Sequence, residues 1–514
     1  MPSRPAQVAS GHEETTQAAV EALRAGGNAV DALVAAGWTA CVAEPIFCSL
    51  GGGGAALLRM RGRAPSMLDF FTQTPRQRRV DDLDFYPIHG NFGTDTQEFH
   101  VGMGAVAVPG TAAGFEELHR RHGRVPMREL VAIAADRARR GVHYNATQAF
   151  ALDILEPIVR ATPEASAMFG MASGDAPLPA AGDVLTNPPL ADCMEALAEH
   201  GSELFYRGEI AVRIAEMSTA SAGHLQLADL AGYRVRWRRP TKWSLGSATV
   251  WSNPPPAFGG LMVELMTRAL EHVLPDGAVF GSEAHLDALT TAMRDSDEDR
   301  LELEQPDCLR CDRALMRRFR ALGPPGRRVS RGTTHMAVRD GDGNFAGMTL
   351  TNGEGCGRVV PGCGFMLNNM LGEEDLNRFG FHRWPTNRRL SSMIAPTLVE
   401  RDGERVLLGS GGSNRIRTAI AQVLCNLQHF DMGLAEAIDA PRLHLEGGRL
   451  AIELGGEGAV DWPDSCAEWL ARRFPDARRW PERSLYFGGV NAVSDADAAA
   501  DPRRDGHAWS GRIA

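Results

Sequence analysis

Two β-favouring runs on either side of a glycine-rich turn constrain the fold of this 514-residue chain more than any other feature. Residues 333–338 (TTHMAV) and 345–351 (FAGMTLT) are rich in β-branched and apolar side chains, and residues 340–344 (DGDGN) separate them. Strands that flank such an Asx- and glycine-rich turn form a β-hairpin. The preceding residues, 323–332 (GPPGRRVSRG), are polar and aperiodic, which indicates a loop. The sequence therefore predicts a loop that ends at Gly332 and runs directly into a hairpin.

The junction between Gly332 and Thr333 is also a candidate site of self-cleavage. A threonine freed as an N-terminus carries a hydroxyl nucleophile and an α-amine base on one residue. The reference pKa of an α-amine is about 7.7–8.0, so part of it is unprotonated at neutral pH. Because Gly332 has no Cβ, its carbonyl can adopt the strained geometry that attack by the adjacent hydroxyl requires. Glycine and threonine before a strand are common, so this hypothesis depends on the rest of the chain.

Several further motifs accompany the hairpin in a fixed order. Downstream they are residues 352–357 (NGEGCG), 360–369 (VPGCGFMLNN), 389–397 (RLSSMIAPT), 409–415 (GSGGSNR) and 500–504 (ADPRR). Upstream they are residues 17–32, 44–54 and 108–115. Together with Thr-Thr-His at 333–335, these motifs resemble the γ-glutamyltransferase family. The resemblance extends over nearly the whole chain.

This resemblance implies an N-terminal nucleophile hydrolase of the α+β class, a four-layer αββα sandwich built from both halves of an autocleaved chain. Residues 1–332 would form a helix-rich large subunit and residues 333–514 a small subunit, together one intertwined domain. The implied activity is that of a γ-glutamyltransferase or glutathione hydrolase: Thr333 attacks a γ-glutamyl amide, and water or an acceptor amine releases the acyl-enzyme. The alternative is a related amidase or acylase that acts on another N-acyl substrate. No metal or organic cofactor is implied, and the implied partners are the small-molecule substrate and the two subunits themselves.

The resemblance assigns catalytic roles around Thr333. Thr351 resembles a second threonine whose hydroxyl supports the nucleophile, and Thr349 is the alternative. The oxyanion donors are assigned to Gly411 and Gly412, or to Gly412 and Ser413. Backbone N–H groups at such a strand-to-helix bend can point together at developing negative charge.

Substrate-binding residues are implied in the same way. Ser391 and Ser392 match the pair that holds the substrate carboxylate, since hydroxyls and backbone N–H groups can donate to such an anion. Asn352 is expected to contact the substrate amine. The family also uses an arginine for the carboxylate, and bidentate pairing favours that residue type. Arg76 is the candidate, although an ungapped register puts Val80 at the family's position.

The chain departs from the family where the substrate α-amine should bind. In place of a polar residue followed by an Asp, it has Met370 and Glu373. Met370 cannot make the usual amide hydrogen bond, whereas Glu373 keeps the charge on a side chain one methylene longer. Glu374 and Asp375 are near enough to substitute. We therefore expect hydrolysis to outweigh transfer and γ-glutamyl selectivity to be weaker than in the family.

Composition argues against several other functions. The net charge is −10 and no long basic run occurs, so we expect neither nucleic acid nor a membrane as a partner. Residues 1–10 (MPSRPAQVAS) lack the apolar core of a secretory signal, and a cytoplasmic location is expected. Nine cysteines, spread thinly, suit a reducing compartment. Cys308 and Cys311 lack the further ligands that zinc requires, and residues 51–54 (GGGG) lack the Lys-Ser/Thr of a phosphate loop.

Helical and strand patterns outside the hairpin are simpler. Residues 12–44 predict two helices interrupted at Gly26 and Gly27, with Asn28 or Asp31 as the cap of the second. Residues 126–140 predict another helix, and most of the middle, 145–330, is expected to be amphipathic helices. After the hairpin, residues 397–400 and 406–408 predict two strands joined by a turn, followed by a helix to about residue 428.

Overall fold

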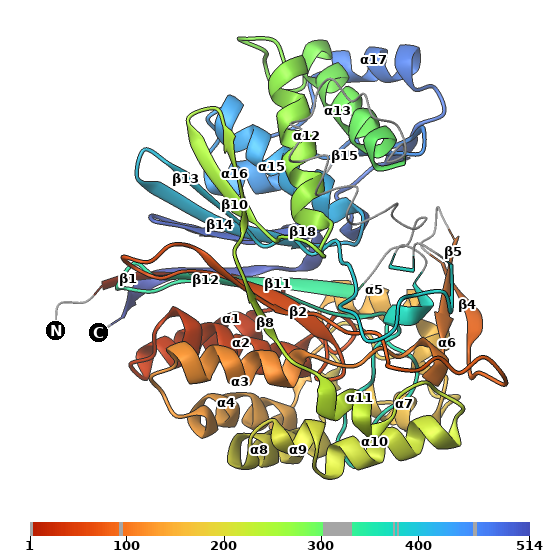
Figure 1. Ribbon diagram of the computed structural model, residues 1–514. Coiled ribbons are helices and arrows are strands. Elements are labelled where there is room, and N and C mark those ends of the chain that lie inside the picture. Colours follow the sequence, from red (N-terminus) through yellow and green to blue (C-terminus); the bar gives the residue numbers. More distant parts are fainter. Residues whose placement is uncertain are drawn as a thin grey trace.

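Two β-sheets lie face to face between two layers of helices in the computed structural model (Figure 1), which describes residues 4–91, 96–301, 332–373, 376–377, 380–455 and 460–513. The inner faces meet where β11 and β12 of one sheet contact β14 and β18 of the other. This four-layer arrangement confirms the αββα architecture and the α+β class.

The first sheet has the strand order β20-β1-β11-β12-β2-β3-β8 and is antiparallel throughout. Its strands are β1 (Arg4–Ser10), β2 (Gly53–Arg59), β3 (Ser66–Phe70), β8 (Arg236–Arg238), β11 (Gly332–Arg339), β12 (Phe345–Gly353) and β20 (His507–Ile513). The predicted hairpin is β11 and β12, at the centre of this sheet.

The second sheet has the order β19-β18-β14-β13-β10-β9. Its strands are β9 (Thr241–Leu245), β10 (Ala248–Ser252), β13 (Thr397–Arg401), β14 (Glu404–Gly411), β18 (Gly489–Ser494) and β19 (Ala498–Ala499). Each sheet combines strands from before and after residue 332, so the two halves of the chain share both hydrophobic cores.

Helices cover the outer face of each sheet (Figure 1). On the seven-stranded sheet these are α1 (Glu13–Arg24), α2 (Ala29–Ala43) and α3 (Thr111–His122), with α4 (Met127–Arg140) and α8 (Pro188–His200) behind them. On the six-stranded sheet they are α12 (Gly259–Val273), α15 (Arg415–His429) and α16 (Leu434–Asp439), with α13 (Glu283–Leu301) and α17 (Ser465–Arg473) behind them.

Most of the remaining elements are short. The helices among them are α5 (Ala146–Ile154), α6 (Glu156–Val159), α7 (Pro163–Met168), α9 (Glu203–Tyr206), α10 (Glu209–Ala220), α11 (Leu227–Gly232), η1 (Met103–Ala105), η2 (Met370–Gly372), η3 (Leu485–Phe487) and η4 (Pro502–Arg504). The strands are β4 (Tyr86–Asn91), β5 (Thr96–Val101), β6 (Val142–His143), β7 (Val184–Leu185), β15 (Leu443–Glu446), β16 (Arg449–Glu453) and β17 (Arg478–Trp480).

Helix α2 packs directly beneath the central hairpin. Its Asn28 side chain accepts hydrogen bonds from the N–H groups of Val30 and Asp31, while the Asp31 carboxylate accepts one from the Asn28 N–H. Both predicted capping residues therefore act, as a reciprocal capping box. Every residue of α2 is buried, and its small residues let it approach closely: a Cβ on Gly37 would lie 2.6 Å from Met348.

The glycine run at residues 51–54 leads into β2 and is a close crossing of backbones. A Cβ on Gly52 would lie 2.3 Å from the Thr351 carbonyl oxygen, and one on Gly54 would lie 2.4 Å from that of Thr349. Only residues without a Cβ allow β2 to enter the sheet beside β12 in this way.

Some strands were not predicted. The sequence analysis assigns no strand to the residues of β1. β8, β9 and β10 interrupt residues 145–330, which were expected to be mostly helical. β1, β8 and β10 each pair with a strand distant in the sequence, namely β11, β3 and β13, and β9 forms a hairpin with β10. The loop at residues 323–331, Cys308, Cys311, Glu374 and Asp375 lie outside the described residues.

No helix in the described part of the chain has both the length and the apolar character needed to cross a bilayer.

Candidate active site

Thr333 lies in an irregular position of the central hairpin. Gly332 pairs with Gly353, whereas Thr334 pairs with Leu350, so the register shifts between them. Two residues of β12, Thr351 and Asn352, therefore stand opposite the single residue Thr333. This is a β-bulge, which changes the direction of local side chains and interrupts the ladder. Thr333 itself is buried.

The bulge brings the Thr351 hydroxyl to the carbonyl of the junction. Thr351 Oγ1 donates a hydrogen bond to the Gly332 carbonyl oxygen at 2.7 Å and accepts one from the Gly353 N–H at 3.1 Å. Because the Gly353 N–H occupies a lone pair of Thr351 Oγ1, the hydroxyl hydrogen of Thr351 is directed at the Gly332 carbonyl oxygen. Thr351 thus polarises the peptide bond that precedes Thr333.

Thr349, the alternative to Thr351, has a different partner. Its hydroxyl bonds to Nδ1 of His335 at 2.8 Å, directly across the hairpin. Burial lowers the pKa of His335 to about 3, so its imidazole is neutral at physiological pH. His335 packs against Gly409 and its carbonyl accepts a hydrogen bond from Asn491. These contacts join β11 to the second sheet.

The second sheet provides the turn at Gly411 and Gly412. Gly411 ends β14, and a Cβ there would lie 2.2 Å from the Thr333 carbonyl oxygen. Gly412 has φ +114° and Ser413 has φ +54°, after which α15 begins. Two successive residues with positive φ turn the strand sharply into the helix. The predicted oxyanion turn is therefore adjacent to Thr333, and its N–H groups lie at a helix entrance, where they can bind negative charge.

Arg504 contacts the backbone of Thr333 from below the turn. Its Nη1 donates to the Thr333 carbonyl oxygen at 3.1 Å, and its Cδ would lie 2.3 Å from a Cβ on Gly489. Burial lowers the pKa of Arg504 to about 10, so the guanidinium stays charged at neutral pH. Arg504 fixes the position of the residue that carries the candidate nucleophile.

A buried ion network holds the segment that carries Arg504. Asp501 pairs with Arg442 at 2.7 Å and with Arg503 at 3.2 Å, and Arg503 pairs with Glu453 at 2.6 Å. Asp501 also accepts a hydrogen bond from the Val490 N–H in β18. All four side chains are fully or almost fully buried, so each charge depends on its partners for solvation.

On the helix side of the hairpin, the Glu44 carboxyl faces Thr334. It accepts a hydrogen bond from the Thr15 hydroxyl at 2.9 Å. Burial raises the pKa of Glu44 to about 7, against the opposing effects of Thr334, Thr15 and the charge of Arg504. Glu44 is therefore a carboxyl close to β11 whose charge changes near neutral pH.

Ser391 and Ser392 lie in the extended segment before β13. Ser392 is buried, and its carbonyl accepts hydrogen bonds from the N–H groups of Phe258 and Gly259 at the start of α12. Within the described residues, no hydrogen bond joins either serine to Thr333. The pair therefore lies at the N-terminus of α12, where the Ser392 carbonyl already accepts from two of the N–H groups.

The candidate amine-binding residues gather at the end of β12. A Cβ on Gly353 would lie 2.2 Å from Glu373 Oε1 and 2.0 Å from the Asn369 side-chain oxygen. The buried Asn352 side chain points instead toward the carbonyls of residues 366 and 367. Glu373 is thus beside the residue that pairs with Gly332. Met370 is fully buried in the hydrophobic core between the sheets.

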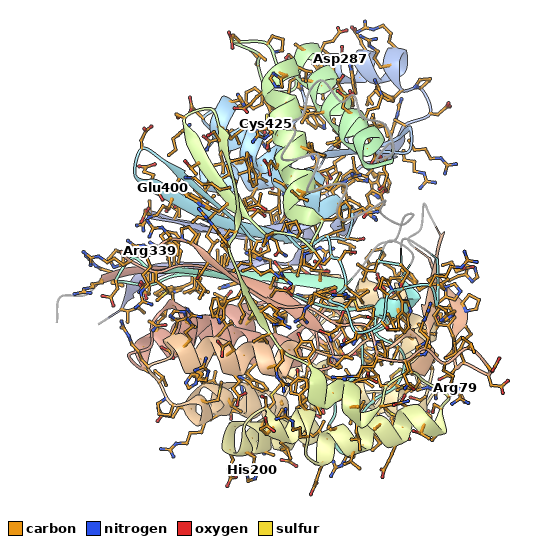
Figure 2. All side chains as sticks on the ribbon, in the orientation of Figure 1. Arg79, His200, Asp287, Arg339, Glu400 and Cys425 are labelled. Atoms are coloured by element: carbon orange, nitrogen blue, oxygen red, sulfur yellow. The ribbon has the colours of Figure 1, made fainter. Side chains whose placement is uncertain are left out.

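Arg76 is not adjacent to Thr333 in any described contact. It is exposed, its N–H donates to Asp229, and its guanidinium packs against Gly232 at the end of α11. Figure 2 shows Arg79 of the same basic run at the edge of the molecule, and Val80 is 77% exposed.

Among the described side chains, no group of three or more His, Cys, Asp or Glu residues could hold a metal ion.

Comparison with known proteins agrees with this geometry. The family described as gamma-glutamyltranspeptidase matches residues 15–511. The chain belongs to this family. It is 32% identical over 476 residues to a glutathione hydrolase proenzyme of Escherichia coli (strain K12), covering 85% of this chain and 80% of that protein. It is 28% identical over 510 residues to an acylase ACY 1 proenzyme of Pseudomonas sp. (strain V22), covering 95% and 89%.

Solved structures support the same fold. The cephalosporin acylase from Bacillus halodurans has a TM-score of 0.81 at 22% identity, covering 99% of this chain and 96% of that chain. The Helicobacter pylori gamma-glutamyltranspeptidase has a TM-score of 0.51 at 24% identity, covering 61% and 90%. This gamma-glutamyltranspeptidase family member is therefore an enzyme with the N-terminal nucleophile hydrolase fold.

Two residues near Thr333, Glu44 and Arg504, were not predicted to belong to the site. Both lie inside motifs that carry the family resemblance, at residues 44–54 and 500–504. Their positions in the sequence are distant from Thr333, and nothing in a single chain indicates that its fold brings all three together. The resemblance could have marked them as candidates, but only the packing of the two sheets gives them a role.

Proposed function

We propose that this protein cleaves itself between Gly332 and Thr333 and then uses Thr333 to hydrolyse or transfer γ-glutamyl amides. The observation that carries the proposal is the 2.7 Å hydrogen bond from Thr351 to the Gly332 carbonyl, in the bulge opposite Thr333. The name of the Escherichia coli relative, glutathione hydrolase proenzyme, supports both the processing and the substrate class.

Self-cleavage begins when Thr333 Oγ attacks the Gly332 carbonyl carbon. The carbonyl oxygen becomes an oxyanion, and the Thr351 hydroxyl already donates to that oxygen. Collapse breaks the C–N bond and leaves an ester between Gly332 and the Thr333 hydroxyl. Breaking the C–N bond transfers a proton to the departing nitrogen and frees the α-amine of Thr333. Water then hydrolyses the ester, which frees the carboxylate of Gly332 and the hydroxyl of Thr333. The products are a large subunit, 1–332, and a small subunit, 333–514.

The freed Thr333 then acts on substrate. Its α-amine accepts the hydroxyl proton as Oγ attacks the amide carbon, and the tetrahedral oxyanion binds at the turn of Gly411 and Gly412. The amine returns the proton to the leaving nitrogen. Water or an acceptor amine then attacks the acyl-enzyme. Arg504 keeps Thr333 in register through the bond to its carbonyl.

Substrate recognition would use both sheets. Glu373, beside Gly353, is the candidate partner of the substrate α-amine, with Asn352 nearby. Ser391 and Ser392, at the N-terminus of α12, are candidates for the carboxylate. Arg76 would need to move from its contact with Gly232 to take part.

A second candidate function is acylase activity on another N-acyl substrate. The observation in its favour is Met370, which is fully buried in the core where the family resemblance calls for a polar residue near the substrate amine. A site with fewer polar contacts discriminates less strongly for a γ-glutamyl group, because a lost buried hydrogen bond costs about 1–3 kcal/mol. The similarity to an acylase proenzyme is consistent with this alternative.

A denaturing gel and a substrate panel test the proposal. Cleavage divides the 514 residues into 332 and 182, so the 55.5 kDa chain gives fragments of about 36 and 20 kDa in the same proportion. The smaller fragment begins Thr-Thr-His-Met. Thr333→Ala should stay intact and inactive. An uncleaved but fully active protein would exclude Thr333 as the nucleophile.

The panel compares p-nitroaniline release from γ-glutamyl and other acyl anilides. Preference for a different acyl group would favour the acylase alternative. With glycylglycine as acceptor, we expect glutamate release to exceed dipeptide formation. Dominant dipeptide product would contradict the expected balance toward hydrolysis.

A further inference from the structure

Two buried thiols from opposite sides of the cleavage junction meet between α8 and the turn that follows β12. Cys193 belongs to α8, before residue 332, and Cys363 follows β12 in the tight turn at residues 360–364. The two thiols are in hydrogen-bonding contact with each other. Both are free thiols and both are buried.

Backbone contacts hold these two segments in place. The Asn187 side chain donates to the Gly364 carbonyl at 2.8 Å, and a Cβ on Gly364 would lie 2.6 Å from the Leu190 nitrogen. Asn187, Leu190 and Cys193 are three residues apart, so they share one face of α8. The turn is therefore docked on that face, with Cys363 directed at Cys193.

Arg213 of α10 covers the pair. Its Nη1 lies 3.2 Å from the Pro361 carbonyl oxygen and 3.7 Å from Cys363 Sγ, and its side chain is 40% exposed. The hydrogen bond with Cys193 and the positive charge of Arg213 lower the pKa of Cys363, against the effects of burial and of Glu209. Cys193 keeps its proton, because that hydrogen bond and burial raise its pKa. Cys363 therefore lies between a second thiol and a half-exposed cation that favours its thiolate form.

We propose that Cys193 and Cys363 are an oxidation site that forms a disulfide on exposure to a hydroperoxide, and that this bond joins the two halves of the chain. The Cys363 thiolate attacks the peroxide, the O–O bond breaks, and a sulfenic acid and water form. The Cys193 sulfur then attacks the sulfenic sulfur, an S–S bond forms and a second water leaves. Two thiols and one hydrogen peroxide become one disulfide and two waters.

The joining of two subunits rests on the proposed cleavage at Gly332 and Thr333, whereas the disulfide itself does not. In the uncleaved chain it would link α8 to the 360–364 turn. In the cleaved protein it would restore a covalent connection between the large and small subunits. The turn belongs to the segment between Gly353 and Glu373, so the bond would also tie this part of the candidate site to α8.

A second thiol pair provides an internal control. Cys41 and Cys48 are also hydrogen-bonded, but both lie in the large subunit. Burial raises the pKa of Cys48 well above its ordinary value, and the neighbouring Glu44 adds to the shift. Because its charged neighbour is a carboxyl and not an arginine, the Cys48 thiol should react slowly with peroxide. Oxidation at Cys193 and Cys363 should therefore proceed while this pair stays reduced.

The experiment treats the full-length purified protein with hydrogen peroxide at pH 7, blocks remaining thiols, and runs denaturing gels with and without reductant. We expect the fragments to migrate as one species near 55 kDa without reductant and to separate with it. Peptide mapping should find Cys193 linked to Cys363. Cys193→Ser and Cys363→Ser should give separate fragments, whereas Cys425→Ser, on α15 in the other helical layer (Figure 2), should behave as wild type.

The outcomes separate the two proposals. A single band under reducing conditions means that cleavage failed, yet the linked peptide would still support the disulfide. Separate fragments without reductant, together with reduced Cys193 and Cys363 peptides, would overturn it. Arg213→Gln should slow disulfide formation about three- to tenfold at pH 7, because less Cys363 is thiolate, and Arg213→Lys should slow it less. An unchanged rate in Arg213→Gln would overturn the activation by Arg213.

Discussion

Replacing Thr351 by valine removes the hydroxyl that donates to the Gly332 carbonyl while keeping the shape of the side chain. In the intact chain this bond, at 2.7 Å, joins neutral groups and contributes only about 1 kcal/mol. In the transition state for self-cleavage the same oxygen becomes an anion. Loss of one oxyanion donor typically lowers a rate by about 10²–10³, equivalent to roughly 3–4 kcal/mol. We expect Thr351→Val to slow cleavage by about 100-fold and Thr351→Ser to restore most of it.

Thr349→Val is the matched control. It makes the same change on the same strand, but Thr349 bonds to His335 and not to the junction. Leaving the buried imidazole without this partner should cost about 1–3 kcal/mol of stability and lower the melting temperature, with cleavage changed only a few-fold. The assay follows conversion of the 55.5 kDa chain to its fragments over time after rapid purification. Wild-type cleavage by folded Thr351→Val, or a greater loss in Thr349→Val, would refute the reasoning.

Four further substitutions test the surroundings of Thr333. Arg504→Met should lower kcat by about tenfold or more with little change in KM, because it removes the hydrogen bond to the Thr333 carbonyl. An effect on KM alone would contradict a positioning role. Gly412→Val should reduce turnover by about 10²–10³, since φ is +114° and a Cβ would lie 2.8 Å from Gly488; normal turnover in cleaved protein would move the oxyanion site elsewhere. Asp501→Asn should destabilise the fold by about 3–5 kcal/mol in denaturant unfolding, because Arg442 and Arg503 lose their shared carboxylate. Glu44 has a folded pKa of about 7, above its ordinary value of 4.5, so its contribution to stability is complete below pH 4.5 and is lost as pH rises through 7. Wild type should therefore lose roughly 3 kcal/mol relative to Glu44→Gln between pH 4.5 and 8, and parallel stability curves would exclude this titration.

The sequence by itself determined the local elements and the identity of the nucleophile candidate. The hairpin around residues 340–344, the capping of α2 by Asn28, and the strands and helix around Gly411 all follow from short-range preferences for turns, caps and periodicity. These preferences act over a few residues, so a single sequence is enough to express them. The order of motifs was sufficient to indicate the family.

Only the tertiary structure decided how the site is assembled. The choice between Thr351 and Thr349 depends on a one-residue bulge, and a register shift of that size leaves no mark in the pattern of a strand. Arg504 and Glu44 reach the strand that carries Thr333 because η4 and the end of α2 pack close to it, whereas Arg76 lies against α11. Short strands such as β1 and β8 form because a distant partner supplies their hydrogen bonds. Contacts between residues hundreds of positions apart are set by the packing of two sheets around shared cores, and no local preference encodes them.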